Sequence, residues 1–144
     1  MERLVNCDIN IMIETIERIT GGNRQFEIVL ATRDDILSQP KWYKLCFNHV
    51  VALRYTIENG FLDRGVKLSR AVDNNSTVLI IENSELKQEF SREVAGTFKT
   101  DDIDCYFIGD NTDTIIEVLS IGKPTLIQYE PTSEENENSS LITY

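Results

Sequence analysis

The chain has no excess of positive charge and no long apolar run. Among its 144 residues, 24 Asp and Glu stand against 14 Lys and Arg, which gives a formal net charge of −10. A surface of this sign repels a phosphate backbone, so nucleic acid is not an expected partner. No stretch approaches the roughly 18 apolar residues of a membrane-spanning helix, and the first residues lack the basic and apolar regions of a secretory signal. We therefore expect a cytoplasmic protein with no membrane partner.

Paired cysteines are also missing. Cys7, Cys46 and Cys105 stand singly, and an odd number without paired spacing disfavours both a disulfide framework and a zinc site. Because strand-like residues flank each of them, we interpret all three as small buried apolar side chains rather than reactive thiols.

The short motifs of catalysis and cofactor binding are absent. The sequence contains no Gly-x-Ser-x-Gly, Ser-x-x-Lys or His-Glu-x-x-His, and its glycines form no phosphate-binding loop. The single histidine, His49, lies on the apolar phase of an expected strand, which favours a structural role over that of a base. A Cys46–His49 dyad would need a bulge, because side chains three residues apart on a strand point to opposite faces. We expect no enzyme activity, no cofactor and no metal.

The strongest pattern that is present is an alternation over residues 43–57. The odd positions are apolar or aromatic apart from His49, whereas the even positions are mixed, and a helix would not sustain this pattern. At about 3.3 Å per residue the segment would span roughly 50 Å, which is too long for one flat strand in a small domain. We expect a bulge, a bend or a split near Asn48-His49.

Turn residues divide the rest of the chain into shorter elements. One helix is expected after Asn83 or Ser84, which can cap it, and it would end at Gly96. Short apolar runs predict a strand covered on both faces at 77–82, and further extended segments at 66–72, 103–108, 114–121 and 124–129. A two-turn helix is the alternative for 114–121. At the N-terminus, residues 5–19 fit either a strand or a helix, and we favour a hairpin with its turn at residues 20–24 and its second strand at 26–32.

These elements predict an α+β fold, a mostly antiparallel sheet with one main helix packed on one face. We expect a single α+β domain over residues 1–129. Residues 130–144 are acidic and hold no apolar side chain before Leu141, so we expect a disordered tail there.

The order of the predicted elements from Trp42 onward resembles that of known proteins. A long aromatic and aliphatic strand ends at Tyr55–Glu58, a helix start follows at residues 82–86, and segments 105–110 and 115–119 precede Pro124. This order resembles a loose group of small bacterial α+β proteins, some of them immunity proteins that neutralise polymorphic toxins. The resemblance covers about ninety residues. It implies a single domain, a protein partner and no enzyme activity, and it assigns no functional residues.

Two groups of residues are candidates for a partner surface. Trp42, the only tryptophan, lies beside Tyr43 and shares the even phase of the long strand with Arg54. Exposed there it would anchor a contact, and the alternative is that it caps the edge of the core. Asp101, Asp102 and Asp104 form an acidic cluster at the start of an expected strand. Aspartate is common in turns, so a turn at this point accounts for the cluster. The spacing of these residues does not match a calcium-binding loop.

We therefore expect a non-enzymatic acidic binding protein, such as an immunity-type inhibitor of a basic toxin. The half-apolar even face of the long strand also indicates a possible homodimer. The alternatives are a small-molecule or nucleotide-binding domain of a sensor or anti-defence type, and an enzyme with an unrecognised site that uses His49.

Overall fold

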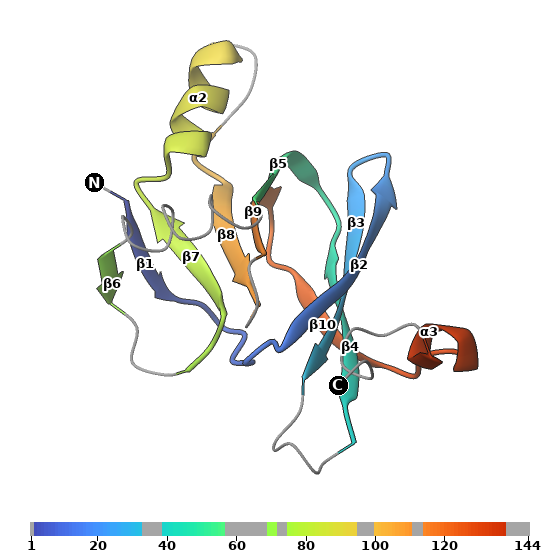
Figure 1. Cartoon of the computed structure of the whole chain (residues 1–144). Helices are drawn as coiled ribbons and strands as arrows, with labels where there is room; N and C mark the ends of the chain where they lie inside the picture. Colours follow the sequence, from blue (N-terminus) through green and yellow to red (C-terminus); the bar gives the residue numbers. More distant parts are fainter. Residues whose placement is uncertain are drawn as a thin grey trace.

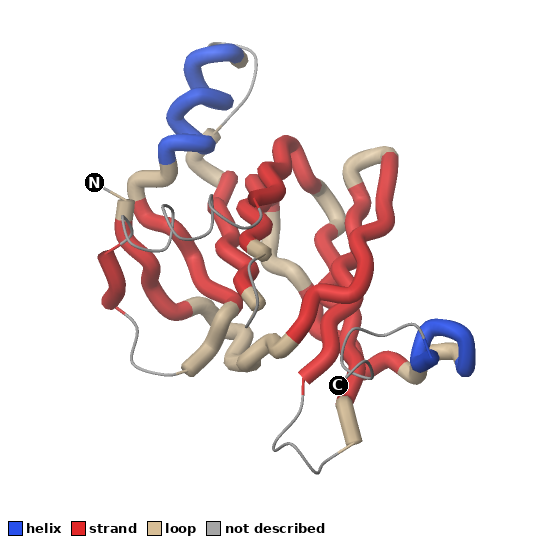
Figure 2. Tube along the Cα trace, viewed as in Figure 1, coloured by secondary structure: helices blue, strands red, loops and turns tan. Residues whose placement is uncertain are grey.

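Two β-sheets pack against each other in the computed structural model, which describes residues 2–32, 39–56, 69–71, 75–94, 100–110 and 114–137 (Figures 1 and 2). The larger sheet has the strand order β5-β9-β8-β7-β1-β6 and the smaller sheet the order β10-β4-β3-β2. The larger sheet consists of β1 (Arg3–Asn6), β5 (Val50–Thr56), β6 (Ser69–Ala71), β7 (Val78–Glu82), β8 (Ile103–Gly109) and β9 (Ile115–Ile121). The smaller consists of β2 (Thr15–Gly22), β3 (Gln25–Thr32), β4 (Lys41–Phe47) and β10 (Thr125–Tyr129).

The expected fold class, α+β with one main helix packed on one face, is wrong. The described chain is rich in strands, and α2 (Glu85–Glu93) has no buried side chain. The helix stands at one end of the larger sheet, beyond β7 and β8 (Figure 1). The physical reason is that a second sheet, and not a helix, supplies the layer that buries the apolar face of the first.

The split expected in the long strand is confirmed at Asn48-His49. β4 ends at Phe47 in the smaller sheet, and β5 begins at Val50 in the larger sheet. The antiparallel neighbour makes the same passage, since β9 pairs with β5 and β10 pairs with β4. Gly122, with φ of 85°, lies between β9 and β10, and the Ile121 N–H donates to the His49 carbonyl oxygen at 2.9 Å. The two strands therefore form one ribbon that bends from sheet to sheet.

The core lies between the sheets and extends over the outer face of the larger one. An inner cluster contains Ile28, Leu30, Leu45 and Phe47 from the smaller sheet and Val78, Tyr106, Ile108, Ile116 and Val118 from the larger. An outer cluster on the larger sheet contains Leu4, Leu79, Ile81, Ile103, Cys105, Phe107, Ile115 and Leu119. Strands β7, β8 and β9 are thus buried on both faces, which explains their nearly continuous apolar runs. The expectation of a strand covered on both faces at 77–82 is confirmed.

The expected N-terminal hairpin is confirmed as β2 and β3, although β2 begins only at Thr15. Its turn residues Asn23 and Arg24 have φ of 53° and 72°, which is the conformation of a two-residue type I′ turn. A Cβ on Gly21 would lie 2.4 Å from the Gln25 carbonyl oxygen, so the hairpin end requires glycine there. The preceding residues form β1 in the other sheet, between β7 and β6.

Most of the remaining expected elements are present. Residues 114–121 and 124–129 contain the strands β9 and β10, and the helix begins after Ser84 as expected. Within 66–72 only the short β6 is described, parallel to β1, and Gly96 lies outside the described residues. Residues 133–137, where we expected disorder, form the short helix α3 (Ser133–Glu137). No helix in the described part of the chain is long and apolar enough to cross a membrane.

An ion pair links two strands of the larger sheet across their outer face. Arg54 on β5 lies directly opposite Glu117 on β9. Arg54 Nε lies 2.8 Å from Glu117 Oε2, and Arg54 Nη2 lies 3.1 Å from Oε1. The Glu117 side chain is fully buried, whereas that of Arg54 is 35% exposed. The guanidinium therefore holds a carboxylate that has no access to water.

We predict that Arg54→Met lowers the free energy of unfolding by about 2 kcal/mol, because it removes the bidentate partner of a buried carboxylate. Urea denaturation measures this change. The double variant Arg54→Met/Glu117→Gln should lose less, since no charge then remains buried without its partner. Equal losses in the two variants would show that the buried charge is not the source of the effect.

Candidate functional site

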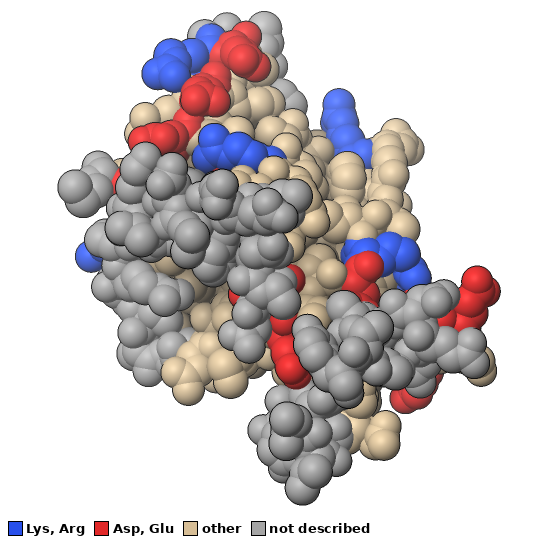
Figure 3. All heavy atoms as spheres, viewed as in Figure 1, with Lys and Arg blue, Asp and Glu red and all other residues tan. Residues whose placement is uncertain are grey.

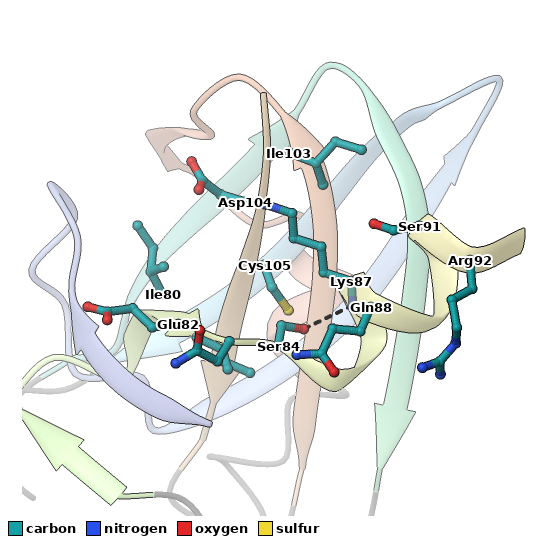
Figure 4. Close-up of a pocket in the computed structure, with 12 residues that line it drawn as sticks. Ile80, Glu82, Ser84, Lys87, Gln88, Ser91, Arg92, Ile103, Asp104 and Cys105 are labelled. Carbon is teal, nitrogen blue, oxygen red and sulfur yellow. Dashed lines mark hydrogen bonds between the residues drawn. The ribbon is translucent and has the colours of Figure 1, made fainter. Parts of the chain in front are cut away.

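A cleft opens where the paired parts of β7 and β8 end. The two strands pair only from Val78 to Ile80 on β7, and the chain then turns at Asn83 into α2. The cleft between the strand ends and the helix has a volume of about 650 Å³ (Figure 4). Its lining is mostly polar and consists of Ile80, Ile81, Glu82, Asn83, Ser84, Lys87, Gln88, Ser91, Arg92, Ile103, Asp104 and Cys105. We call this site the α2 cleft.

Charged side chains of both signs line the α2 cleft, Glu82 and Asp104 against Lys87 and Arg92. Arg3 binds both oxygens of Glu82, at 3.0 and 3.1 Å, and so neutralises that side chain. Beyond this pair, the described residues of this end offer two cations, Lys87 and Arg92. Six exposed carboxylates belong to α2, to the turn before β8 and to β8, and of these only Asp104 lines the cleft: Glu85, Glu89, Glu93, Asp101, Asp102 and Asp104. Acidic side chains accordingly lie along α2 in Figure 3, and Lys87 extends over the cleft whereas Arg92 points away from it (Figure 4).

The N-terminus of α2 is already occupied by side chains of the chain itself. Ser84 Oγ accepts the Lys87 N–H at 3.1 Å, and the carboxylate of Glu2 accepts the Glu85 N–H at 3.0 Å. Glu2 is only 7% exposed. A helix N-terminus often binds an external anion such as phosphate, but here a buried carboxylate already fills that position.

The thiol at the base of the cleft is not activated. Cys105 is 1% exposed, and its side chain points toward Ser84 (Figure 4). Burial raises the pKa of the Cys105 thiol to about 12, against a smaller opposing effect of the Ser84 hydrogen bond. Burial also raises the pKa of Cys7 and of Cys46. Each thiol is therefore protonated at neutral pH, as expected of structural cysteines, although only Cys105 is fully buried.

His49 lies at the corner between the sheets. Its Nε2 is 3.2 Å from Arg24 Nη1, and because a guanidinium only donates, Nε2 acts as the acceptor in this contact. Within the described ranges, no three His, Cys, Asp or Glu side chains converge as metal ligands would.

The structure separates the first group of predicted site residues. Trp42 lies on the outer face of the smaller sheet, Tyr43 packs on the inner cluster, and Arg54 belongs to the larger sheet. Trp42 is not the exposed anchor considered above, since only 4% of it is accessible. The alternative was right that Trp42 is buried, but it lies in a separate cluster with Val29 and Ala31 rather than at the edge of the main core.

Residues beyond β10 fold back beside Trp42. The Tyr129 ring lies 6.3 Å from the Trp42 ring, centre to centre, and Glu134 and Glu135 of α3 border the same small pocket as Trp42. The carboxylate of Glu135 is bound by the Tyr129 hydroxyl, by the Arg18 guanidinium and by the Thr132 N–H. These donors, with Tyr129 first, lower the pKa of Glu135 to about 2.

Of the second group of predicted residues, the structure places only Asp104 in the lining of the α2 cleft. Asp101 and Asp102 are exposed in the turn before β8, and Asp104 is exposed on β8, where it lines the cleft. Sequence reasoning missed Lys87 and Gln88 as lining residues, although their position on the polar side of the expected helix could have indicated it. It also missed Glu2, because nothing local connects that residue with a helix more than eighty positions away.

No protein-family model, no curated protein and no solved structure matches the chain. The resemblance to immunity proteins thus remains a prediction from the order of sequence signals, and the site itself must carry any functional argument.

We predict that Glu135→Ala releases α3 from β2 and β10 and exposes Trp42. Since Trp42 is the only tryptophan, its fluorescence reports on this contact alone. Emission should move to longer wavelength, and acrylamide should quench it more strongly than in the unmodified protein. Glu134→Ala, one position earlier on the same helix, is the matched control, and an equal shift in both variants would contradict the role of Glu135.

We predict that Cys105 resists alkylation by iodoacetamide at pH 8 in the folded protein and reacts after unfolding in urea, as read by mass spectrometry. Its folded pKa of about 12 exceeds that of an unfolded thiol, roughly 8.5. Folding therefore favours the protonated thiol. The resulting contribution of Cys105 to the free energy of unfolding is fully present below the unfolded pKa of roughly 8.5 and is lost as the pH rises toward 12. Rapid labelling of Cys105 in the folded state at pH 8 would contradict this assignment.

Proposed function

We propose that the protein is a non-catalytic binding protein that receives a basic segment of a protein partner at the α2 cleft. An immunity-type inhibitor of a basic toxin would act in this way. The observation that carries the proposal is an open cleft lined by the exposed carboxylate of Asp104, at an end of the sheet where the described residues of α2 and of the turn before β8 carry five further exposed carboxylates. We further propose that the encounter takes place in the cytoplasm, in keeping with three unpaired cysteines.

The chemistry of the cleft fits the side chain of a lysine or arginine. Ile80, the apolar lining residue that is only partly buried, offers contact for the methylene groups of such a side chain, and Asp104 offers a carboxylate for its charged end. The net charge of −10 would steer a basic partner toward the protein over a distance of about one Debye length, roughly 8 Å at physiological salt. Lys87 lies within the cleft and would have to turn toward solvent or toward a carboxylate of the partner.

A second candidate function is the binding of a small polar molecule in the same cleft. Its volume of about 650 Å³ lies within the range of ligand pockets. Nucleotides are disfavoured within this alternative, because Glu2 occupies the helix N-terminus where a phosphate would bind. A ligand at a hundred times its dissociation constant would stabilise the fold by about 2.7 kcal/mol, so a thermal-shift screen of amino acids, amines and nucleotides distinguishes the two functions.

We predict that Asp101→Lys/Asp102→Lys weakens binding of the basic partner at least tenfold. The partner is first recovered with the tagged, unmodified protein from an extract of the source organism and identified by mass spectrometry, and its affinity is then measured by calorimetry. The loss follows because the substitution replaces attraction by repulsion at the rim of the cleft. The affinity of the unmodified protein should also fall as salt is raised.

The matched control is Glu14→Lys/Glu134→Lys, which changes the net charge by the same amount away from α2. It should retain most of the affinity. Equal weakening by both pairs would indicate a general charge effect without a site at α2, and recovery of chaperones alone would contradict the proposed function.

A further inference from the structure

Three of the four strands at the sheet edges are protected against pairing with another chain. On β2 the register with β3 shifts between Ile16 and Arg18, and on β5 the register with β9 shifts between Val50 and Ala52. Each shift places an extra residue in the edge strand, and such bulges twist an edge away from new partners. The third edge strand, β6, has only three residues.

The fourth edge strand, β10, has none of these protections. Its five residues pair with β4 in an unbroken register. The stretch from Thr125 to Tyr129 contains no charge, proline or glycine, although 26% of the whole chain is charged. Thr125 and Gln128 are exposed, and Ile127 at the centre is 50% exposed, one of the three large apolar side chains in the described part that face water. A flat, uncharged and exposed edge is a template for strand addition.

We propose that β10 pairs with β10 of a second copy of this chain, antiparallel and centred on Ile127. A twofold axis at the central residue places Ile127 opposite its own counterpart and Thr125 opposite Tyr129 of the other copy. The strands then exchange roughly four to six main-chain hydrogen bonds, and the smaller sheet continues from one copy into the other. α3 leaves this edge accessible, because its contacts run over the sheet face from Tyr129 to Arg18.

The charge distribution favours a second copy at this edge. Two chains of net charge −10 repel each other wherever their carboxylates meet, so close approach requires an uncharged strip, which β10 supplies. At both ends of the strip the twofold register brings Lys123 of one copy beside Glu130 and Pro131 of the other. The Lys123 side chain is 75% exposed beside Asp8, so it can serve a second carboxylate as well.

This inference goes beyond the proposed function. α2 stands at the end of the larger sheet, whereas β10 is an edge of the smaller one (Figure 1). The α2 cleft is lined by residues of β7, α2 and β8 and by none of β10. The dimer leaves the α2 cleft open, and either proposal can fail without the other.

The test measures the mass of the full-length protein by sedimentation velocity over a range of concentrations. The unmodified chain should dimerise. Ile127→Lys places two like charges against each other on the twofold axis, with Lys44 opposite each of them on β4, and should weaken dimerisation at least a hundredfold. Ile127→Glu alone should weaken it less, because Lys44 partly neutralises each new carboxylate.

The decisive measurement mixes the two variants. In the mixture, the lysine at position 127 of one variant faces the glutamate at position 127 of the other, so a heterodimer should form with a higher affinity than the homodimer of either variant. Only a twofold axis at residue 127 predicts this rescue. Met12→Lys, a change at another exposed apolar side chain, should leave dimerisation intact, and circular dichroism checks that each variant is folded. The proposal would be overturned if the unmodified protein is monomeric, if Ile127→Lys leaves the dimer unaffected, or if the mixture shows no rescue. It would also be overturned if a different protein is found to pair with β10.

Discussion

The bend of one antiparallel ribbon is the constraint on which the rest of the structure depends. β4 and β10 must leave the smaller sheet at the points where β5 and β9 enter the larger one, and the bond from the Ile121 N–H to the His49 carbonyl keeps the two strands together through the turn. Gly122 adopts a positive φ in that passage, which a residue with a Cβ would enter only with strain. Once the ribbon has bent, the inner faces of the two sheets bury each other, and a helix is not needed as a second layer.

The position of the candidate site follows from this arrangement. Because the second sheet occupies the inner face, α2 is left at the end of the larger sheet, held there by Leu86 and Phe90 against the outer cluster. Its first turn is bound by Glu2, so the segment before β1 and the helix after β7 stabilise each other at the same end. The cleft is the space that remains where the paired parts of β7 and β8 end beneath the helix. It is a consequence of how the sheet ends, and most of its charged lining residues come from the strand ends and the helix, where the core does not constrain them.

Local patterns were sufficient to predict most of the strands, the β2–β3 hairpin, a helix cap at Asn83 or Ser84 and the interruption at Asn48-His49, but not the separate strand β1. They were not sufficient to predict that the two halves of the long strand belong to different sheets, because alternation specifies which residues share a face and not what lies opposite that face. The same limit explains Trp42. Its outward phase was correct, yet the residues that pack against it, Val29, Ala31 and Tyr129, come from two other strands, β3 and β10, and β10 is distant in the sequence. The acidic character of Asp101, Asp102 and Asp104 was visible in the sequence, whereas the cleft beside them required the geometry of three elements.

The distribution of charge also separates two kinds of contact on one small molecule. In the proposed functions, the carboxylates at the α2 end would attract a basic partner and repel another copy of the chain, whereas the uncharged β10 edge would do neither. Pairing at a strand edge is stabilised by main-chain hydrogen bonds, which a strand of any sequence can form. The selectivity of such pairing must therefore come from features that prevent pairing at the other edges of the molecule. On this molecule, pairing at the other edges is opposed by the bulges on β2 and β5, by the shortness of β6 and by the net negative charge of the chain. A dimer built at β10 would present two acidic clefts at once, and a partner with two basic segments at matching separation would bind it with a higher effective concentration than a single copy allows.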